Sequence, residues 1–406
     1  MKAGLSQQRV RLKYRARVEM GQSPPSTDYS STPEDGLPFL QGTVDFGAAS
    51  PIPRVYCMSP TKVARAGDIL FSVRAPVGEL NRADQDYGIG RGLCAIQVHQ
   101  LFDRRFAWWA LHEARHQLNL VSTGSTYDAV ATEDVANLAV EAPALSAQRA
   151  IADYLNREAE RLDALVAAKE QVLGLLAEKR RALITRAVTR GLDPHAPLRD
   201  SGIPWLGKLP AHWRTRRAAW LFRERDERGE PDLPLLEVSI NAGVVLREFS
   251  EERIESTAAD FNTYKVARQG DVAFNKMRMW QGAVGVASQD GLVSPDYVVA
   301  APTGPLAPEY AGLLFRTEIF SAECARRSHG IVWDRLRLYW EGFREIELPL
   351  PPADAQREIV AYAAEETARL DALRLSTERS IALLKERRAA LIAAAVTGQI
   401  DVESVA

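Results

Sequence analysis

The feature that most constrains this chain is a long internal repeat. The stretch AQRAIADYLNREAERLDALVAAKEQVLGLLAEKRRALITRAVT begins at Ala147, and AQREIVAYAAEETARLDALRLSTERSIALLKERRAALIAAAVT begins at Ala355. The offset, 355 − 147 = 208 residues, holds without a gap, and about half of the positions are identical. Because 208 is about half of the 406 residues, the sequence indicates two halves, each a block followed by one copy of the repeat.

Each copy has the apolar spacing of an amphipathic helix, with steps of three and four residues. In the first copy the spaced residues are Ile151, Leu155, Ala159, Leu162, Val166, Leu173, Leu176, Leu183 and Ala187. In the second they are Ile359, Ala363, Leu370, Leu373, Ile381, Leu384 and Leu391. A continuous helix over 147–190 would be roughly 65 Å long. We therefore expect two long helices that bury these faces against each other as an antiparallel coiled coil.

The two blocks ahead of the helices have the short extended segments and Gly and Pro punctuation of mixed α/β domains. Gly67–Asp68 and Gly270–Asp271 each open a comparable apolar segment, which indicates that the blocks are related. The expected fold class is α+β, with two mixed α/β domains, each followed by a long helix, and pseudo-two-fold symmetry. The expected boundaries are 1–142 for the first block, 143–192 for the first helix, 193–350 for the second block and 351–406 for the second helix.

Composition excludes several classes of protein. No apolar run approaches the roughly 18 to 20 residues that a membrane span needs, and the N-terminus has no apolar segment of the kind that secretory signals carry. Three scattered cysteines suit a reducing cytoplasm and form no zinc-binding spacing. The net charge of −2 taken alone argues mildly against nucleic acid binding, but basic residues cluster locally at 2–17 and 208–228, so net charge leaves the question open.

One motif has the form of a catalytic site. HEARH at 112–116 matches the H-E-x-x-H pattern of zinc proteases, in which two histidines bind zinc and the glutamate acts as a base. Arg115 places a cation between the two candidate ligands, so we favour a solvated helix over a zinc site. SPDY at 294–297 and GIGRG at 88–92 also fall short of the methyltransferase and phosphate-loop patterns. Without a catalytic constellation, the sequence favours a recognition or scaffold protein.

The chain as a whole resembles the specificity subunit of Type I restriction–modification systems. The most specific elements are the two repeats, with AQRAI, RLDAL and EKRRALI in one and AQREI, RLDAL and KERRAALI in the other, and the PP-x-x-x-QR entry at 351–357. The linker DSGIPWLGKLPAHW at 200–213 resembles the opening of a target-recognition domain. The first entry, EAPALSAQR, departs from the paired-proline pattern.

This resemblance implies a non-catalytic DNA-binding subunit in which two target-recognition domains each read one half of a bipartite, asymmetric site on double-stranded DNA. It also implies partners: two modification subunits that bind S-adenosylmethionine and methylate adenine, and a restriction subunit, using ATP and Mg, where cleavage occurs. The chain itself would hold no cofactor or metal and would work in the cytoplasm of a prokaryote. Two alternatives are a zinc-dependent hydrolase built on HEARH and a coiled-coil adaptor with no DNA role.

Polar and basic residues in Gly-flanked loops are the candidates for DNA contact, because base edges are read by such side chains. The candidates are Arg74, Arg91, Ser125, Tyr127, Lys276, Arg278, Trp280, Gln281, Arg327, Ser328 and His329. In RLDAL the charged residues lie two apart and do not face each other on a helix. Candidates for docking the partner subunits are therefore Arg161, Asp163, Arg369 and Asp371.

Overall fold

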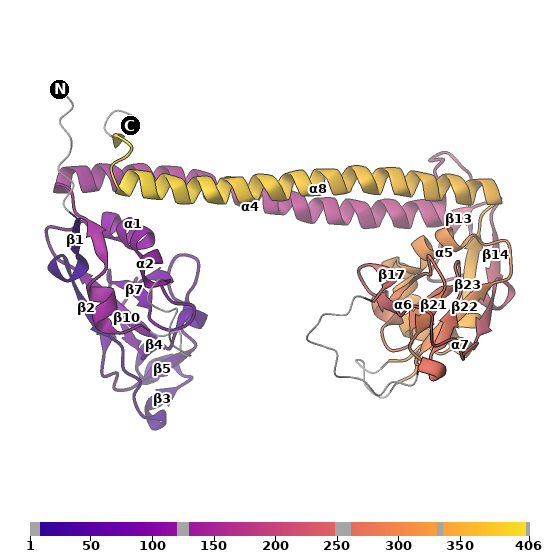
Figure 1. Cartoon of the computed structure of the whole chain (residues 1–406), viewed down its shortest axis with the longest axis horizontal. Helices are drawn as coiled ribbons and strands as arrows, with labels where there is room; N and C mark the ends of the chain where they lie inside the picture. The colour runs from indigo at the N-terminus through magenta and orange to yellow at the C-terminus, as the bar shows by residue number, and fades with distance from the viewer. Residues whose placement is uncertain (1–8, 120–129, 248–260, 331–335, 403–406) are drawn as a thin grey trace. The chain divides into compact units, whose positions relative to one another are not determined.

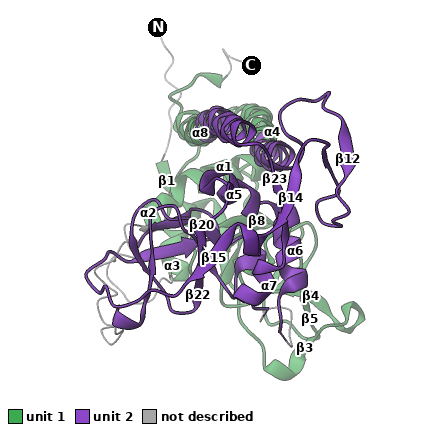
Figure 2. Ribbon diagram, turned by 90° about the vertical axis from the view of Figure 1, so that its right-hand side faces the viewer, with its two compact units in different colours: residues 1–170, 379–406 green, residues 171–378 purple. Residues whose placement is uncertain are grey.

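The computed structural model describes residues 9–119, 130–247, 261–330 and 336–402. The chain forms two compact units, coloured separately in Figure 2: unit 1 holds residues 1–170 and 379–406, and unit 2 holds residues 171–378. Within the described ranges, no helix is both long enough and apolar enough to cross a membrane.

The two predicted long helices are present as α4 (Leu145–Arg190) and α8 (Ala353–Val396). In unit 1 they run antiparallel, because Asp163 pairs with Arg388 and Glu170, further along α4, pairs with Lys385, which comes earlier in α8. In unit 2 the same two helices lie side by side, and Arg180 pairs with Asp371 (Figure 1). The expected antiparallel helix pair is therefore confirmed.

The buried face of each helix largely follows the predicted spacing. Among the predicted seam residues, those fully buried are Ile151, Leu155, Ala159, Leu162, Ala187, Ile359, Ala363, Leu370 and Ile381. The prediction was wrong for Leu373, whose side chain is 51% exposed. The buried positions nearest to Leu370 on α8 are Ala363, seven residues before it, and Ile381, eleven residues after it. With 3.6 residues per turn these three positions fall on one line along the helix, whereas a residue three positions after Leu370 is turned aside from that line.

The first block is built on two sheets. One has the strand order β2-β10-β7-β8, and the other has the order β3-β5-β4-β9-β6. The strands of the first are β2 (Ala16–Met20), β10 (Leu93–Val98), β7 (Ile69–Ser72) and β8 (Leu80–Arg82). Those of the second are β3 (Tyr29–Ser30), β5 (Val55–Cys57), β4 (Leu37–Leu40), β9 (Tyr87–Ile89) and β6 (Val63–Ala64). The pair β1 (Arg9–Arg11) and β11 (Ala139–Glu141) closes the block, and the helices are α1 (Arg104–Ala114), α2 (His116–Asn119) and α3 (Thr132–Ala136).

The second block has a four-stranded sheet of order β15-β22-β19-β20. Its strands are β15 (Phe222–Arg225), β22 (Tyr297–Pro302), β19 (Val272–Asn275) and β20 (Val284–Val286). The strand pairs are β12 (Leu198–Asp200) with β13 (Lys208–Pro210), β14 (Arg214–Arg217) with β23 (Glu347–Leu350), β16 (Leu236–Ser239) with β17 (Gly243–Leu246), and β18 (Lys265–Ala267) with β21 (Gly291–Val293). The helices are α5 (Pro308–Phe315), α6 (Glu318–Arg327) and α7 (Trp340–Arg344).

The two blocks share one topology. In chain order, β2, β7, β8 and β10 of the first block match β15, β19, β20 and β22 of the second, and the two sheets have the same strand order. The closing pairs β1–β11 and β14–β23 also match, as do β6–β9 and β18–β21. This relationship was expected from the two Gly-Asp turns, and the topology confirms it.

Each unit buries its main core between its block and the long helices. In unit 1 the core combines Phe71 and Phe106 of the block with Leu155 of α4 and Val396 of α8. In unit 2 it combines Phe274 and Phe315 with Val188 of α4 and Ile359 of α8. Burial of these side chains fixes each block to its helices, at roughly 1.5–3 kcal/mol for each large apolar side chain.

Candidate nucleic-acid interface

In the first block, two of the predicted loops meet beyond the end of β7. The amide of Val73 donates to the carbonyl oxygen of Gly92 (3.0 Å), and the carbonyl oxygen of Val73 accepts from the amide of Val130 (2.9 Å). These bonds bring the loop that carries Arg74 beside the turn that carries Arg91 and beside Val130. The sequence indicated these loops separately, and the backbone hydrogen bonds at the end of β7 place them side by side.

The second block repeats this arrangement at the end of β19. The carbonyl oxygen of Lys276 accepts from the amide of Leu338 (2.9 Å), and His329 and Arg337 exchange backbone hydrogen bonds of 2.9 and 3.0 Å. The loop with Lys276, Arg278, Trp280 and Gln281 therefore lies beside the segment with Arg327, Ser328 and His329. Candidates more than forty residues apart in the chain form one surface.

The described candidates differ in how free their side chains are. Arg74, Arg91, Arg278 and Gln281 are exposed. Lys276 is half-buried, with Nζ 6.0 Å from the centre of the Tyr339 ring. The exposed side chains carry the donors that read guanine or adenine edges. Ser125 and Tyr127 lie outside the described residues.

The remaining candidates are partly engaged in local structure. The indole Nε1 of Trp280 donates to the carbonyl oxygen of Met277 (2.9 Å). Arg327 donates to the carboxylate of the buried Glu323 (2.9 Å), and the hydroxyl of Ser328 donates to the carbonyl oxygen of Cys324 (2.7 Å). Trp280 and Gln281 also line a cleft of about 870 Å³ with Arg316 and Arg326.

Two polar residues that organise the loops were missed by sequence reasoning. Ser72, the last residue of β7, donates through its hydroxyl to the carbonyl oxygen of Pro76 (2.6 Å) and accepts from the amide of Glu79 (2.8 Å). Asn275, the last residue of β19, accepts from the amide of Met277 through Oδ1 (2.9 Å). Both are buried. The signal was available, since each is a polar residue that ends an otherwise apolar strand.

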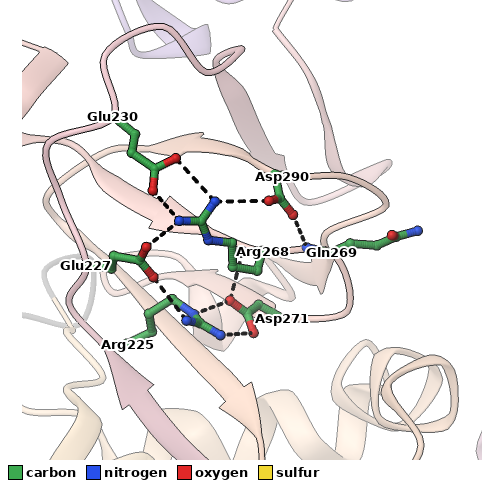
Figure 3. A network of polar contacts seen from close by, with 7 residues as sticks. All are labelled: Arg225, Glu227, Glu230, Arg268, Gln269, Asp271 and Asp290. Atoms are coloured by element: carbon green, nitrogen blue, oxygen red, sulfur yellow. Dashed lines mark hydrogen bonds and ion pairs between the residues drawn. The ribbon is translucent and has the colours of Figure 1, made fainter.

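Three cations of the basic run at 208–228 form ion pairs: Arg217, Arg225 and Arg228. Arg225 donates to Asp271 (2.7 Å), and Arg228 donates to Asp226 (2.9 Å). Arg225 belongs to the network of Figure 3, in which Arg268 lies among Glu227, Glu230 and Asp290. The network braces the turn before β19, so we assign it to structure.

The turn before β7 in the first block corresponds to the turn before β19 and has fewer charged contacts. The amides of Ala66 and Gln269 donate to Asp86 (2.9 Å) and Asp290 (2.8 Å), and these amides, followed by Arg65 and Arg268, hold the pKa of both carboxyls below the usual range. Asp86 and Asp290 thus bond equivalent turns, the ones that precede β7 and β19.

The HEARH motif does not form a metal site in the described structure. Helix α1 ends at Ala114, so the two histidines belong to different helices. The ring of His112 packs on Trp108 and Trp109, while Nδ1 of His116 contacts the carbonyl oxygen of Glu113. Burial, followed by Arg115, Arg388 and Arg82, lowers the pKa of His112 to about 3. Surrounding cations also disfavour a dication, and the described residues contain no cluster of three or more His, Cys, Asp or Glu that could hold a metal ion.

The predicted docking residues lie on the long helices in ion pairs. Asp163 lies 2.9 Å from Nε of Arg388, and Asp371 lies 2.8 Å from Arg180. Because 163 + 208 = 371 and 180 + 208 = 388, these are equivalent pairs, each joining the two helices within one unit. Arg161 and Arg369 pair with glutamates of their own helices and are largely exposed. The docking role of these four residues remains a prediction.

Two blocks of one topology, each with a cluster of exposed basic and polar loops and each packed on a pair of long helices, define a two-domain recognition protein. Residues 59–173 match the family Methylase_S, the Type I restriction modification DNA specificity domain. Over these residues the chain carries the DNA specificity domain of Type I restriction–modification systems, and it is similar to the specificity subunits of such systems.

Individual relatives agree with this placement. The putative type I restriction enzyme MjaX specificity subunit of Methanocaldococcus jannaschii is 36% identical over 157 residues, an alignment that spans 38% of this chain and only 37% of the relative. The type I restriction enzyme EcoDI specificity subunit of Escherichia coli is 21% identical over 375 residues, covering 86% of this chain and 80% of the relative.

Two solved structures share the fold. One comes from a study of complex assembly and conformational transition of the type I R-M system, with a TM-score of 0.72, 18% identity, and coverage of 96% of this chain and 97% of that chain. The other is the HsdS subunit from Thermoanaerobacter tengcongensis, with a TM-score of 0.54, 19% identity, and coverage of 98% and 99%.

Proposed function

We propose that this chain directs a Type I restriction–modification complex to a bipartite, asymmetric DNA site. Each block reads one half of the site through the loops beyond β7 and β19. The long helices keep the two halves a fixed number of base pairs apart, as a flexible linker could not. Readers on one face of B-DNA are expected roughly one helical turn apart, about 34 Å, or a multiple of it.

The observation that carries this proposal is the convergence of the candidate loops at the same place in both blocks. Val73 and Lys276 each follow the central strand, and each accepts a backbone hydrogen bond from a returning segment, at Val130 and Leu338. Around these bonds lie the exposed residues Arg74, Arg91 and Arg278. Arginine on a structured loop is well suited to bidentate contact with guanine and to phosphate contact.

The chemistry is then supplied by partners. We propose that two modification subunits bind S-adenosylmethionine and methylate one adenine in each half-site after flipping it out of the duplex. A restriction subunit that uses ATP and Mg would add cleavage where it is present. Because its target is chromosomal and invading DNA, the complex would work in the cytoplasm.

The helices offer a surface for these partners. Leu165 and Leu373, the last residues of the two RLDAL segments, are exposed, and so are Leu175 and Leu383. Each pair is related by the 208-residue offset. Exposed leucines on a helix surface favour a protein partner, and the equivalence of the two sets favours two copies of one partner.

The test is to express the chain with the modification subunit encoded beside it in a host that lacks adenine methylation. Single-molecule sequencing of the host DNA should then reveal methylated adenines in one two-part motif with a fixed gap. The chain alone should produce no methylation. Methylation without sequence preference would contradict the proposal, and methylation unchanged after residues 1–142 are exchanged would favour the adaptor alternative.

A further inference from the structure

A buried glutamine occupies the same place in the first turn of both long helices. Gln148 of α4 and Gln356 of α8 are related by the 208-residue offset, and each is 1% exposed. A glutamine amide loses its hydrogen bonds to water when it is buried, so its burial is costly unless protein groups replace them. The contacts of the two side chains therefore indicate what each is for.

Gln148 joins the start of α4 to the start of α1. Its Oε1 accepts from the amide of Asp103, the residue that caps α1 (2.7 Å). Its Nε2 donates to the carbonyl oxygens of Pro143 (2.7 Å) and Leu101 (3.2 Å). One side chain thus holds the linker, the long helix and the first helix of the block together.

Gln356 makes the same three bonds in unit 2. Its Oε1 accepts from the amide of Ala307, the capping residue of α5 (2.7 Å). Its Nε2 donates to the carbonyl oxygens of Pro351 (2.9 Å) and Pro305 (3.1 Å). Both glutamines bond the residue five positions earlier, at the entry to the long helix, and the loop that begins the first helix of the block.

We infer that Gln148 and Gln356 are positioning residues that fix the angle at which each recognition block leaves its long helix, and that they thereby set the number of base pairs between the half-sites. The inference rests on the proposed function. Base pairs are stacked 3.4 Å apart, so a small tilt of a block about its junction would move its reading loops by the height of one base pair.

The other polar contacts between each block and the long helices predict which glutamine contributes more to fixing its block. Three further polar contacts tie α1 to α4 in unit 1: Trp109 donates to Asn156 (3.0 Å), Arg105 pairs with Asp153, and Arg149 lies 3.7 Å from Asp103. In the described part of unit 2, the other polar contact between α5 and a long helix runs to α4 and not to α8, from the hydroxyl of Tyr310 to the carbonyl oxygen of Val188 (2.6 Å). Loss of Gln356 should therefore loosen its junction more than loss of Gln148.

The experiment uses the complete complex with its modification subunit and compares wild type, Gln148→Met and Gln356→Met by methylation sequencing. Methionine keeps the length of the side chain but removes all three bonds. Methylation of sites whose gap is one base pair too long or too short should rise about tenfold relative to sites with the native gap, as expected when buried polar groups lose their partners. The rise should be larger for Gln356→Met.

Two controls separate positioning from loss of stability. Val293→Ala removes two buried methyl groups from a core cluster of the second block that contains no residue of the long helices, and it should lower the melting temperature while leaving the gap unchanged. Gln171→Met makes the same change at an exposed position of α4 and should alter neither. If Gln356→Met does not fold, Gln356→Asn retains the amide on a shorter side chain and should broaden the gap in the same direction.

The outcomes are distinct. A wild-type complex with one gap and glutamine variants with a broadened gap would support the inference. Variants that melt at a lower temperature but keep the single native gap would overturn it and leave the proposed function intact. A wild-type complex with no two-part motif would overturn both.

Discussion

Ser72 and Asn275 end equivalent strands, and each bonds the backbone of the loop that follows it. A side chain can recognise a base only if the backbone that carries it has one conformation, because each freely rotating residue adds an entropic cost to binding. The two buried polar residues supply this order to the loops with Arg74 and Arg278. The sequence showed the arginines, and the signal for their supports was a polar residue at the end of each apolar strand.

His112 gives a testable dependence of stability on pH. Its pKa in the folded chain, lowered to about 3 by burial and by Arg115, Arg388 and Arg82, lies below the ordinary value near 6.5. As the pH falls below about 6.5, the unfolded chain takes up a proton that the folded chain does not, so the free energy of unfolding should fall by up to about 1.4 kcal/mol per pH unit.

We expect His112→Gln to remove this part of the slope. The measurement is urea denaturation of both chains at several values between pH 6.5 and pH 4.5. The difference in unfolding free energy between variant and wild type should move in favour of the variant as the pH falls. A difference that is constant across this range would show that His112 is not held neutral in the fold.

At the scale of elements, the long helices were the most predictable part of the molecule. The three- and four-residue spacing predicted a helix over 147–190, and α4 spans Leu145–Arg190. The error at Leu373 is informative, because the spacing rule cannot tell a partner helix in the same chain from one in another chain. Leu373 fits the apolar spacing of α8, but this chain leaves its side chain exposed.

The exposed leucines lead to a prediction about assembly. Leu175→Glu and Leu383→Glu should each weaken binding of the modification subunit, roughly tenfold for the loss of one well-buried leucine contact. The fold should be unaffected, because these side chains are 56% and 57% exposed. Pull-down of purified modification subunit over a concentration range, with circular dichroism of each variant, measures both effects.

Leu198→Glu serves as the matched control, because it places the same charge at an exposed leucine in β12, outside the long helices. Equal weakening by all three variants would argue that general surface charge, and not this helix surface, governs assembly.

At the scale of the whole molecule, two blocks of one topology should act as independent readers. Arg91→Gln in the first block and Arg278→Gln in the second should relax opposite halves of the methylated motif. Loss of a bidentate arginine contact costs about 1–3 kcal/mol of discrimination at one base pair. The motif measured by methylation sequencing should keep its gap and its unaltered half in each variant.

Substitutions in both blocks that relaxed the same half of the motif would contradict this division of labour. A uniform drop in methylation at all sites would instead assign the changed arginine to a phosphate contact, which holds the protein on DNA without reading sequence.

The sequence by itself determined the two halves, the two long helices and the family, because repeats and helical periodicity are local patterns that survive without three-dimensional information. Tertiary structure alone decided which loops meet, which cations are neutralised and what the repeated glutamines bond. The loops of Arg74 and Arg91 become neighbours through the backbone bond between Val73 and Gly92. The charge of Arg225 in the basic run is neutralised because the side chain pairs with Asp271. Contacts between distant residues depend on the packing of whole elements, so no local pattern contains them.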